Sequence, residues 1–261
     1  MPAQTAGRDR VRVGVVGFGA LGRGVVDRLW HGVVPRAELV GVVNRSPVSG
    51  SPVPRWSLAQ AVESCDLLIE CAGQDAVRET LEAVAGLERT VVVTSVGALL
   101  DPELRDRRGS AERVVPTHGA IGGLDILQSA ALAHPFDRVQ VSSSKLPASV
   151  LRPWMSPRRQ EAIRQCAEPV LVFEGGVDEA ARLFPASLNV AAAVALAVQD
   201  PDVVEVRLWA DPGAVRTVHR IVASGPVGDY DVRCENVPSA DNPRSSAVVV
   251  HSVLRTVSTL V

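Results

Sequence analysis

Six residues near the start of the chain have the types and spacing of a phosphate-binding loop. The run GFGALG is a G-x-G-x-x-G, and its members are Gly17, Phe18, Gly19, Ala20, Leu21 and Gly22. Gly17 allows a sharp turn, Gly19 lets a pyrophosphate approach the backbone because it has no Cβ, and Gly22 lets a helix pack close to a sheet. The motif predicts dinucleotide binding; the alternative is a glycine-rich turn in some other α/β protein.

The segments on either side of this loop have the patterns that such a site requires. Residues 11–16, VRVGVV, are an apolar, β-branched run that predicts a buried parallel strand. After the loop, Leu21, Val25, Val26 and Leu29 fall on one face of a predicted helix. The free N–H groups and the positive dipole end of that helix are then expected to hold the phosphates.

Strands and helices alternate over the first part of the chain, which predicts a doubly wound parallel sheet of the Rossmann type. The predicted strands cover residues 11–16, 37–43, 66–72, 90–95 and 113–116, and the predicted helices cover 21–29, 57–63, 75–85 and a segment that begins at Asp101. Ligands of such a sheet bind at the carboxyl ends of the strands, near the point where the strand order reverses. This rule selects further candidate contacts in the turns after the strands, namely Asn44, Arg45, Ser46, Cys71, Ala72, Gly73, Ser95, Val96, Gly97 and the turn 118–123.

The turn after the second strand bears on the choice of dinucleotide. Asn44 stands where an acidic residue would hold the adenosine ribose 2′-hydroxyl and repel a 2′-phosphate. Asn44 is neutral, Arg45 is cationic and Ser46 can donate a hydrogen bond, so the turn predicts that NADP is tolerated or favoured, with NAD as the other possibility. The alternative role for Arg45 is stacking on the adenine.

The pattern changes after about residue 119. Strand-like runs cover 138–143, 170–174, 203–209, 218–223 and 228–234, with helices expected at 124–133, 180–183 and 189–198. These elements predict a second, α+β domain with a mixed or antiparallel sheet. We expect residues 1–118, completed by a C-terminal helix within 244–261, to form the dinucleotide-binding domain, and residues 119–243 to form the second domain.

Composition narrows the class of protein. The chain has 261 residues, 46% of them hydrophobic, and a formal net charge of −2, which argues against binding to nucleic acid. The four cysteines lack C-x-x-C spacing, which favours reduced thiols in a cytoplasmic protein over a metal site or a disulfide framework. The start of the chain has no apolar signal-peptide region, and no apolar run reaches the length of a membrane span.

Two of the five histidines lie near plausible chemistry. His118 precedes the turn Gly119–Gly123, and His219 begins a predicted strand of the second domain. A lone histidine on a strand is more often structural than catalytic, and neither a Ser-His-Asp order nor metal-ligand spacing is evident.

Several segments together resemble one family, the L-aspartate dehydrogenases. They are VGVVGFGALGRGV, VVNRSP, IECAGQDAV, TSVGALLD, THGAIGGLDIL, EGGVDEAARLFPASLNVAAAVALA, WADPGAVRTVHRI and ENVPSADNPRSSA. They run from the first strand into the last helix, so the resemblance covers nearly the whole chain. GAIGGLD and FPASLNVAAA are far more specific than the glycine motif.

The resemblance implies an activity and site residues. The family oxidises L-aspartate with NAD(P) to iminoaspartate, which hydrolyses to oxaloacetate and ammonia or enters pyridine nucleotide biosynthesis. Its catalytic histidine corresponds to His219, and two cofactor contacts correspond to Ala120 and Asn189. Its second domain supplies the catalytic surface and a dimer contact, so a homodimer is expected here.

Three departures from the family pattern concern the substrate. His118 stands where the family usually has serine, Ser187 replaces the first asparagine of FPxNxN, and Leu146 replaces the first proline of Lys-Pro-Pro. Another small acidic amine or imine therefore stays open as the substrate. A nucleotide-binding relative without catalysis is the alternative of a different class.

Aspartate carries two carboxylates, so its pocket needs more than one cation or fixed donor. Lys145, the only lysine, is the first candidate because it follows a strand and matches the family's Lys-Pro-Pro. The further candidates are Arg244, Ser245, Ser246 and His118. Lys145 and Arg244 could equally be solvated surface charges.

Overall fold

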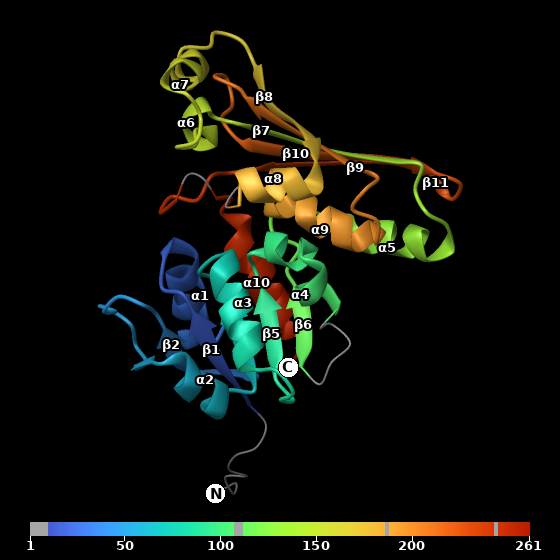
Figure 1. Ribbon diagram of the computed structural model, residues 1–261. Helices are drawn as coiled ribbons and strands as arrows, with labels where there is room; N and C mark the ends of the chain where they lie inside the picture. The colour runs from blue at the N-terminus through green and yellow to red at the C-terminus, as the bar shows by residue number, and fades with distance from the viewer. Residues whose placement is uncertain (1–9, 107–111, 186–187, 243–244) are drawn as a thin grey trace, which may run out of the picture. The chain divides into compact units, whose positions relative to one another are not determined.

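The structure of the chain is a computed structural model, which describes residues 10–106, 112–185, 188–242 and 245–261. Two compact units make up this part of the chain (Figure 1). The first contains residues 10–94, 106, 112–115 and 253–261, and the second contains residues 95–105, 116–185, 188–242 and 245–252. The predicted domain boundary after residue 118 stays a prediction; residues 95–105 lie with the second unit here.

Six strands form the sheet of the first unit, in the order β3-β2-β1-β4-β5-β6. They are β1 (Val11–Val16), β2 (Ala37–Val43), β3 (Arg55–Trp56), β4 (Leu67–Glu70), β5 (Thr90–Val93) and β6 (Arg113–Pro116). The neighbouring pairs from β3 to β5 are parallel. Because β2 lies on one side of β1 and β4 on the other, the strand order reverses at β1, directly before the glycine loop.

Helices α1 (Ala20–Trp30), α2 (Leu58–Ser64) and α3 (Gln74–Ala83) pack on this sheet (Figure 1). Helix α1 buries Val25, Val26 and Leu29, which lie at helical spacing. Helix α2 begins at a capping box, in which Ser57 and Gln60 each accept a hydrogen bond from the backbone of the other. The predicted parallel Rossmann sheet is confirmed, with the two-residue strand β3 as an unpredicted addition.

Five strands form a mixed sheet in the second unit, in the order β11-β10-β7-β9-β8. They are β7 (Arg138–Lys145), β8 (Val170–Gly176), β9 (Val204–Ala210), β10 (Thr217–Gly225) and β11 (Gly228–Asn236). Strands β7 and β9 pair in parallel, and the other neighbouring pairs are antiparallel. The sheet is therefore the mixed alternative of the prediction, and each of its strands ends one or two residues beyond the predicted C-terminal end.

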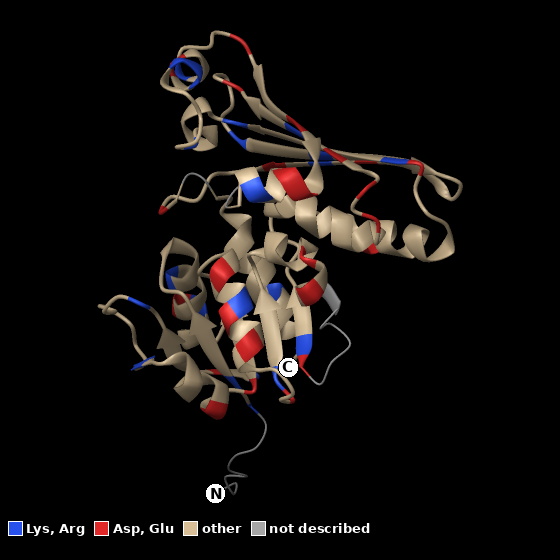
Figure 2. Cartoon of the chain, in the orientation of Figure 1, with Lys and Arg blue, Asp and Glu red and all other residues tan. Residues whose placement is uncertain are grey.

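Two helices cover one face of the second sheet. They are α8 (Val177–Leu183) and α9 (Asn189–Val198), and both contact β9 (Figure 1). Every residue of α9 from Val190 to Val198 is buried, and no charged side chain lies along it (Figure 2). Because α9 packs against α5 (Leu124–Ala133), α8 and the 3₁₀ helix η1 (Val96–Leu100), it forms the core of this unit.

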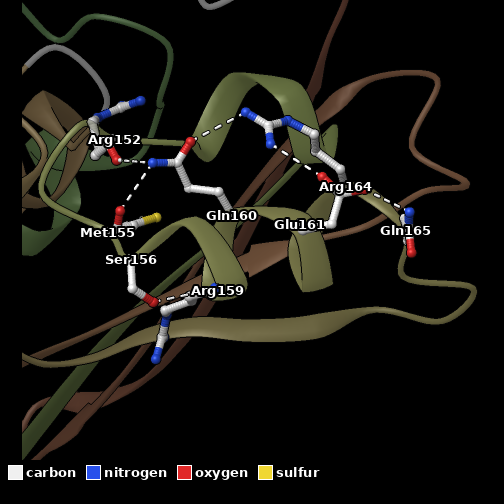
Figure 3. Close-up of polar contacts among 8 residues, drawn as sticks. All are labelled: Arg152, Met155, Ser156, Arg159, Gln160, Glu161, Arg164 and Gln165. Atoms are coloured by element: carbon white, nitrogen blue, oxygen red, sulfur yellow. Dashed lines mark hydrogen bonds and ion pairs between the residues drawn. The ribbon is translucent and has the colours of Figure 1, made fainter.

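The remaining helices are α4 (Pro102–Asp106), α6 (Pro147–Val150), α7 (Pro157–Arg164) and α10 (Val248–Ser258). The last confirms the predicted C-terminal helix. Helices α6 and α7 were not predicted. Side chains fix their connection: Gln160 Nε2 donates to the carbonyl oxygen of Met155 at 2.9 Å, and Ser156 Oγ accepts from Arg159 N at 3.3 Å (Figure 3). Among the described helices, none has both the length and the apolarity to cross a membrane.

Candidate functional site

A cavity of about 340 Å³ opens in the first unit where β1, β2 and β4 end. The predicted residues that line it are Gly17, Phe18, Gly19, Asn44, Arg45, Ser46, Cys71, Ala72 and Gly73. Ala20, Leu21 and Gly22 lie in the first turn of α1, beside these residues. The loops selected by the strand-end rule in this unit therefore meet around one cavity.

The three glycines of the loop differ in what requires them. A Cβ on Gly22 would lie 2.0 Å from the carbonyl oxygen of Gly17, and Gly17 has a φ of +100°. Both positions therefore need glycine for the fold itself. A Cβ on Gly19 would meet nothing within 4 Å. Open space above the Gly19 backbone is what a pyrophosphate needs, so the loop fits the predicted dinucleotide.

Glu70 is a buried carboxylate next to the cavity. No motif in the sequence predicts a role for it. Its Oε1 accepts from Ala72 N and Gly73 N, both at 2.7 Å, and its Oε2 accepts from Thr94 N at 3.2 Å. Glu70 thus accepts the hydrogen bonds of the two amide groups that precede α3. Within the described part of the chain no side chain caps α1, so the α1 N-terminus keeps the N–H groups that a phosphate would use.

The turn after β2 is fixed by its first residue. Asn44 Oδ1 accepts from Phe18 N at 3.2 Å, and Asn44 Nδ2 donates to the carbonyl oxygen of Ser46 at 3.0 Å. Arg45 extends into solvent and pairs with Glu79 on α3, with Nη2 and Oε1 2.6 Å apart. The predicted contact for a 2′-phosphate therefore has a carboxylate partner.

A polar cluster interrupts the apolar buried face of the second sheet. Strand register places Ser143 of β7, His219 of β10 and Cys234 of β11 in one row, and Thr217 opposite Asn236 beside it. Ser143, His219, Thr217 and Lys145 are all buried, and His219 is only 2% exposed. Farther along the same face the strands bury Val141 and Ile221, so the polar side chains gather at one end of the sheet.

Burial determines the charge state of this cluster. Burial first, and the nearby Lys145 cation second, lower the pKa of His219 to about 3. Burial and the Arg152 cation lower the pKa of Lys145 to about 8. Ser143 Oγ lies 2.8 Å from His219 Nδ1 and fixes the ring. At neutral pH His219 is therefore a neutral imidazole, in which one ring nitrogen carries a proton and the other can accept one.

Two amide side chains connect the predicted loops of the second unit. Asn189 Oδ1 accepts from Gly97 N at 3.2 Å, and Asn236 Nδ2 donates to the carbonyl oxygen of Ala120 at 2.8 Å. Ser95 and Val96 are buried at the start of η1. Asn236 and Ser143 were not predicted, because only the strand register brings them to these positions.

The residues predicted to bind the substrate have different surroundings in the structure. Lys145 lies in the polar cluster, His118 is exposed between β6 and α5, and Ser246 is buried in an isolated bridge with Pro238. Ser245 precedes it and accepts through its carbonyl oxygen from Ser239 N at 2.8 Å. Arg244 and the Ser187 departure lie outside the described residues.

Both halves of the chain match known families. Residues 17–114 match the family described as homoserine dehydrogenase, NAD binding domain, and residues 125–260 match aspartate dehydrogenase, C-terminal. L-aspartate dehydrogenase 3 of Bordetella bronchiseptica is 34% identical over 95% of this chain and 94% of its own length. The corresponding enzyme of Cupriavidus taiwanensis is 36% identical over 94% and 96%.

Solved structures of dehydrogenases are also similar to this chain. The crystal structure of aspartate dehydrogenase from Thermotoga maritima superposes with a TM-score of 0.77, at 27% identity, over 96% of this chain and 97% of that one. A hyperthermophilic archaeal homoserine dehydrogenase in complex with NADPH, with a TM-score of 0.57 and 12% identity, shares the fold.

Fold, cavity and relatives define an NAD(P)-dependent oxidoreductase that acts on an amino acid. The chain belongs to the L-aspartate dehydrogenase family, as the resemblance of its motifs predicted.

Proposed function

We propose that the protein oxidises L-aspartate to iminoaspartate with His219 as the general acid and base. The observation that carries this proposal is a neutral, buried imidazole held by Ser143 next to the Lys145 cation. The bound nicotinamide dinucleotide would accept the hydride from the substrate α-carbon. The balanced reaction converts aspartate and NAD(P)⁺ into iminoaspartate, NAD(P)H and a proton, and water then converts the imine into oxaloacetate and ammonium.

His219 suits both proton transfers in this sequence. The α-ammonium group of aspartate must lose a proton before hydride leaves, and a neutral imidazole nitrogen can accept it. A substrate with two carboxylates raises the pKa of a neighbouring histidine, because it stabilises the imidazolium. The same group can then return a proton to nitrogen while water adds to the imine.

Lys145 is the proposed partner of a substrate carboxylate. Its pKa of about 8 leaves the ammonium group largely protonated at neutral pH, and burial strengthens its attraction for an anion. His118, Arg244, Ser245 and Ser246 stay proposed as further donors on sequence grounds alone.

The dinucleotide contacts are proposed in two groups. The cavity of the first unit would hold the adenosine and pyrophosphate, through the glycine loop and the turns after β2 and β4. Ser95, Val96, Gly97, Ala120 and Asn189 would contact the nicotinamide half, as the family resemblance implies. Arg45 would allow NADP to be used at least as efficiently as NAD.

A cofactor-reduction screen tests the proposal. The purified protein is incubated at alkaline pH with NAD or NADP and with L-aspartate, D-aspartate, L-glutamate or L-asparagine, and absorbance at the reduced nicotinamide band is followed. We expect reduction with L-aspartate, and oxidation of the reduced dinucleotide with oxaloacetate and ammonium. Reduction with another amino acid but not with L-aspartate would contradict the substrate, and no reduction with any of them would contradict the activity.

A homodimer in the cytoplasm completes the proposal. The four cysteines are free thiols, as in a reducing compartment. Light scattering of the purified protein would distinguish a dimer from a monomer of 27.6 kDa.

A further inference from the structure

Glu79 lies on the wall of the nucleotide cavity, opposite the turn that follows β2. It belongs to α3, and it lines the same cavity as Asn44, Arg45 and Ser46. Asp75, one helical turn earlier, lines the cavity as well, whereas Glu82 on the same helix does not. Charged residues are concentrated on α3, which Figure 2 shows in red and blue.

The carboxylate of Glu79 pairs with the cation of the β2 turn. Arg45 Nη2 and Glu79 Oε1 are 2.6 Å apart, and the two side chains are 79% and 54% exposed. The backbone beneath Arg45 is held by the hydrogen bonds of Asn44 to Phe18 N and to the carbonyl oxygen of Ser46. The backbone of the turn is therefore held in place, and the Arg45 charge is already paired with the chain's own carboxylate.

The two dinucleotides meet this pair differently. In a sheet of this type the residues after the second strand face the adenosine ribose, where NADP carries a 2′-phosphate and NAD a neutral 2′-hydroxyl. The phosphate must compete with the Glu79 carboxylate for the Arg45 cation, because both groups are anions. The hydroxyl group has no charge and is not affected in this way.

We propose that Glu79 is a specificity-determining residue that sets the balance between NADP and NAD by occupying Arg45. This inference goes beyond the proposed aspartate chemistry and rests only on the dinucleotide cavity. The neutral Asn44 permits a 2′-phosphate, the Arg45 cation attracts it, and Glu79 limits that attraction.

Equilibrium binding without substrate tests the proposal. The dissociation constants of NADPH and NADH are measured by nicotinamide fluorescence for the wild type, Glu79→Gln and the matched control Glu82→Gln. We expect Glu79→Gln to tighten NADPH binding about fivefold, the upper end for an exposed ion pair, and to change NADH binding less than about twofold. Glu82→Gln should leave both constants unchanged. An unchanged NADPH constant in Glu79→Gln, or an equal gain in Glu82→Gln, would overturn the proposal.

A second pair of variants tests whether Glu79 acts through Arg45. Arg45→Ala should weaken NADPH binding about tenfold, because a charge-assisted hydrogen bond to the phosphate is lost. In the Arg45→Ala background, Glu79→Gln should tighten NADPH binding less than about twofold. A fivefold gain that persisted without Arg45 would show that Glu79 acts independently and would overturn the assignment. These binding measurements contain no amino acid, so they can be interpreted even if the protein does not oxidise aspartate.

Discussion

The cavity of the first unit and the polar cluster of the second unit are built in different ways. The cavity is lined mainly by the turns that directly follow strands β1, β2 and β4 and by the adjoining helix α3. The cluster is formed by side chains of different strands, and Ser143 and His219 are 76 positions apart in the sequence. A site of the first kind is visible as a local motif, whereas one of the second kind exists only after the sheet has its register.

The cations of the cavity and of the cluster also differ in their surroundings. Arg45 is solvated and paired with Glu79, so water and a carboxylate both stabilise its charge. Lys145 is buried, and burial lowers its pKa to about 8. The first cation suits the adjustment of affinity for an exposed phosphate, and the second suits a strong, pH-dependent contact with a buried anion.

The largest expected effect separates chemistry in the cluster from binding in the cavity. His219→Gln should lower kcat by about 10²–10⁴, the range for the loss of a general acid or base. The dissociation constant of the dinucleotide and the melting temperature should change little. The exposed His251 provides the control, as His251→Gln should leave kcat unchanged. A joint loss of melting temperature and activity in His219→Gln would instead show that the histidine is structural.

The glycine loop provides the second test, because its positions differ in their surroundings. Gly19→Ala should weaken dinucleotide binding about 10- to 100-fold by blocking phosphate hydrogen bonds, with no change in melting temperature. Gly22→Ala should also lower the melting temperature, because its Cβ would collide with the Gly17 carbonyl oxygen. Calorimetry and nucleotide titration measure the two effects. If Gly19→Ala bound the dinucleotide with unchanged affinity, this would show that the phosphates do not bind at this loop.

A substitution of Lys145 tests whether the polar cluster of the second unit binds the substrate. Lys145→Met should raise KM for L-aspartate about 10- to 100-fold, the cost of a lost charge-assisted hydrogen bond, and leave KM for the dinucleotide nearly unchanged. The ammonium group is protonated below its pKa of about 8 and neutral above it, so the wild-type KM for aspartate should rise above about pH 8. The pH dependence of KM should be absent in Lys145→Met. A dependence that persisted in the variant would belong to another group.

The smallest expected effect concerns Ser143. Ser143→Ala should lower kcat up to about tenfold, the scale of one neutral hydrogen bond, and Ser143→Thr should retain most of the activity. Ser142 lies next to it on the opposite face of β7, so Ser142→Ala is the matched control. Nitrogen NMR of the His219 ring should show a changed tautomer balance in Ser143→Ala alone. An unchanged ring signal would mean that Ser143 does not position the histidine.

Much of the fold could be predicted from local pattern. The bounds of β1 and β2 were predicted to the residue, because each is a β-branched apolar run that ends at a turn-forming sequence. Helix α9 was also predicted to the residue from its continuous alanine and valine run. Strand β3 and helix α6 were missed, since two or four residues carry no measurable periodicity, and α7 was missed because Ile163 is the only buried residue among its eight.

The candidate site divides along the same line. The sequence by itself determined the glycine loop, the turns at Asn44 and Cys71 and, through family resemblance, His219 and Lys145. The tertiary structure alone brought Ser143 opposite His219, Asn236 to Ala120, Glu70 to the Thr94 amide, and Glu79 to Arg45. The first group depends on residues adjacent in the chain, whose backbone geometry follows from their types. The second depends on which strands and helices become neighbours, and that is decided by packing of the whole unit.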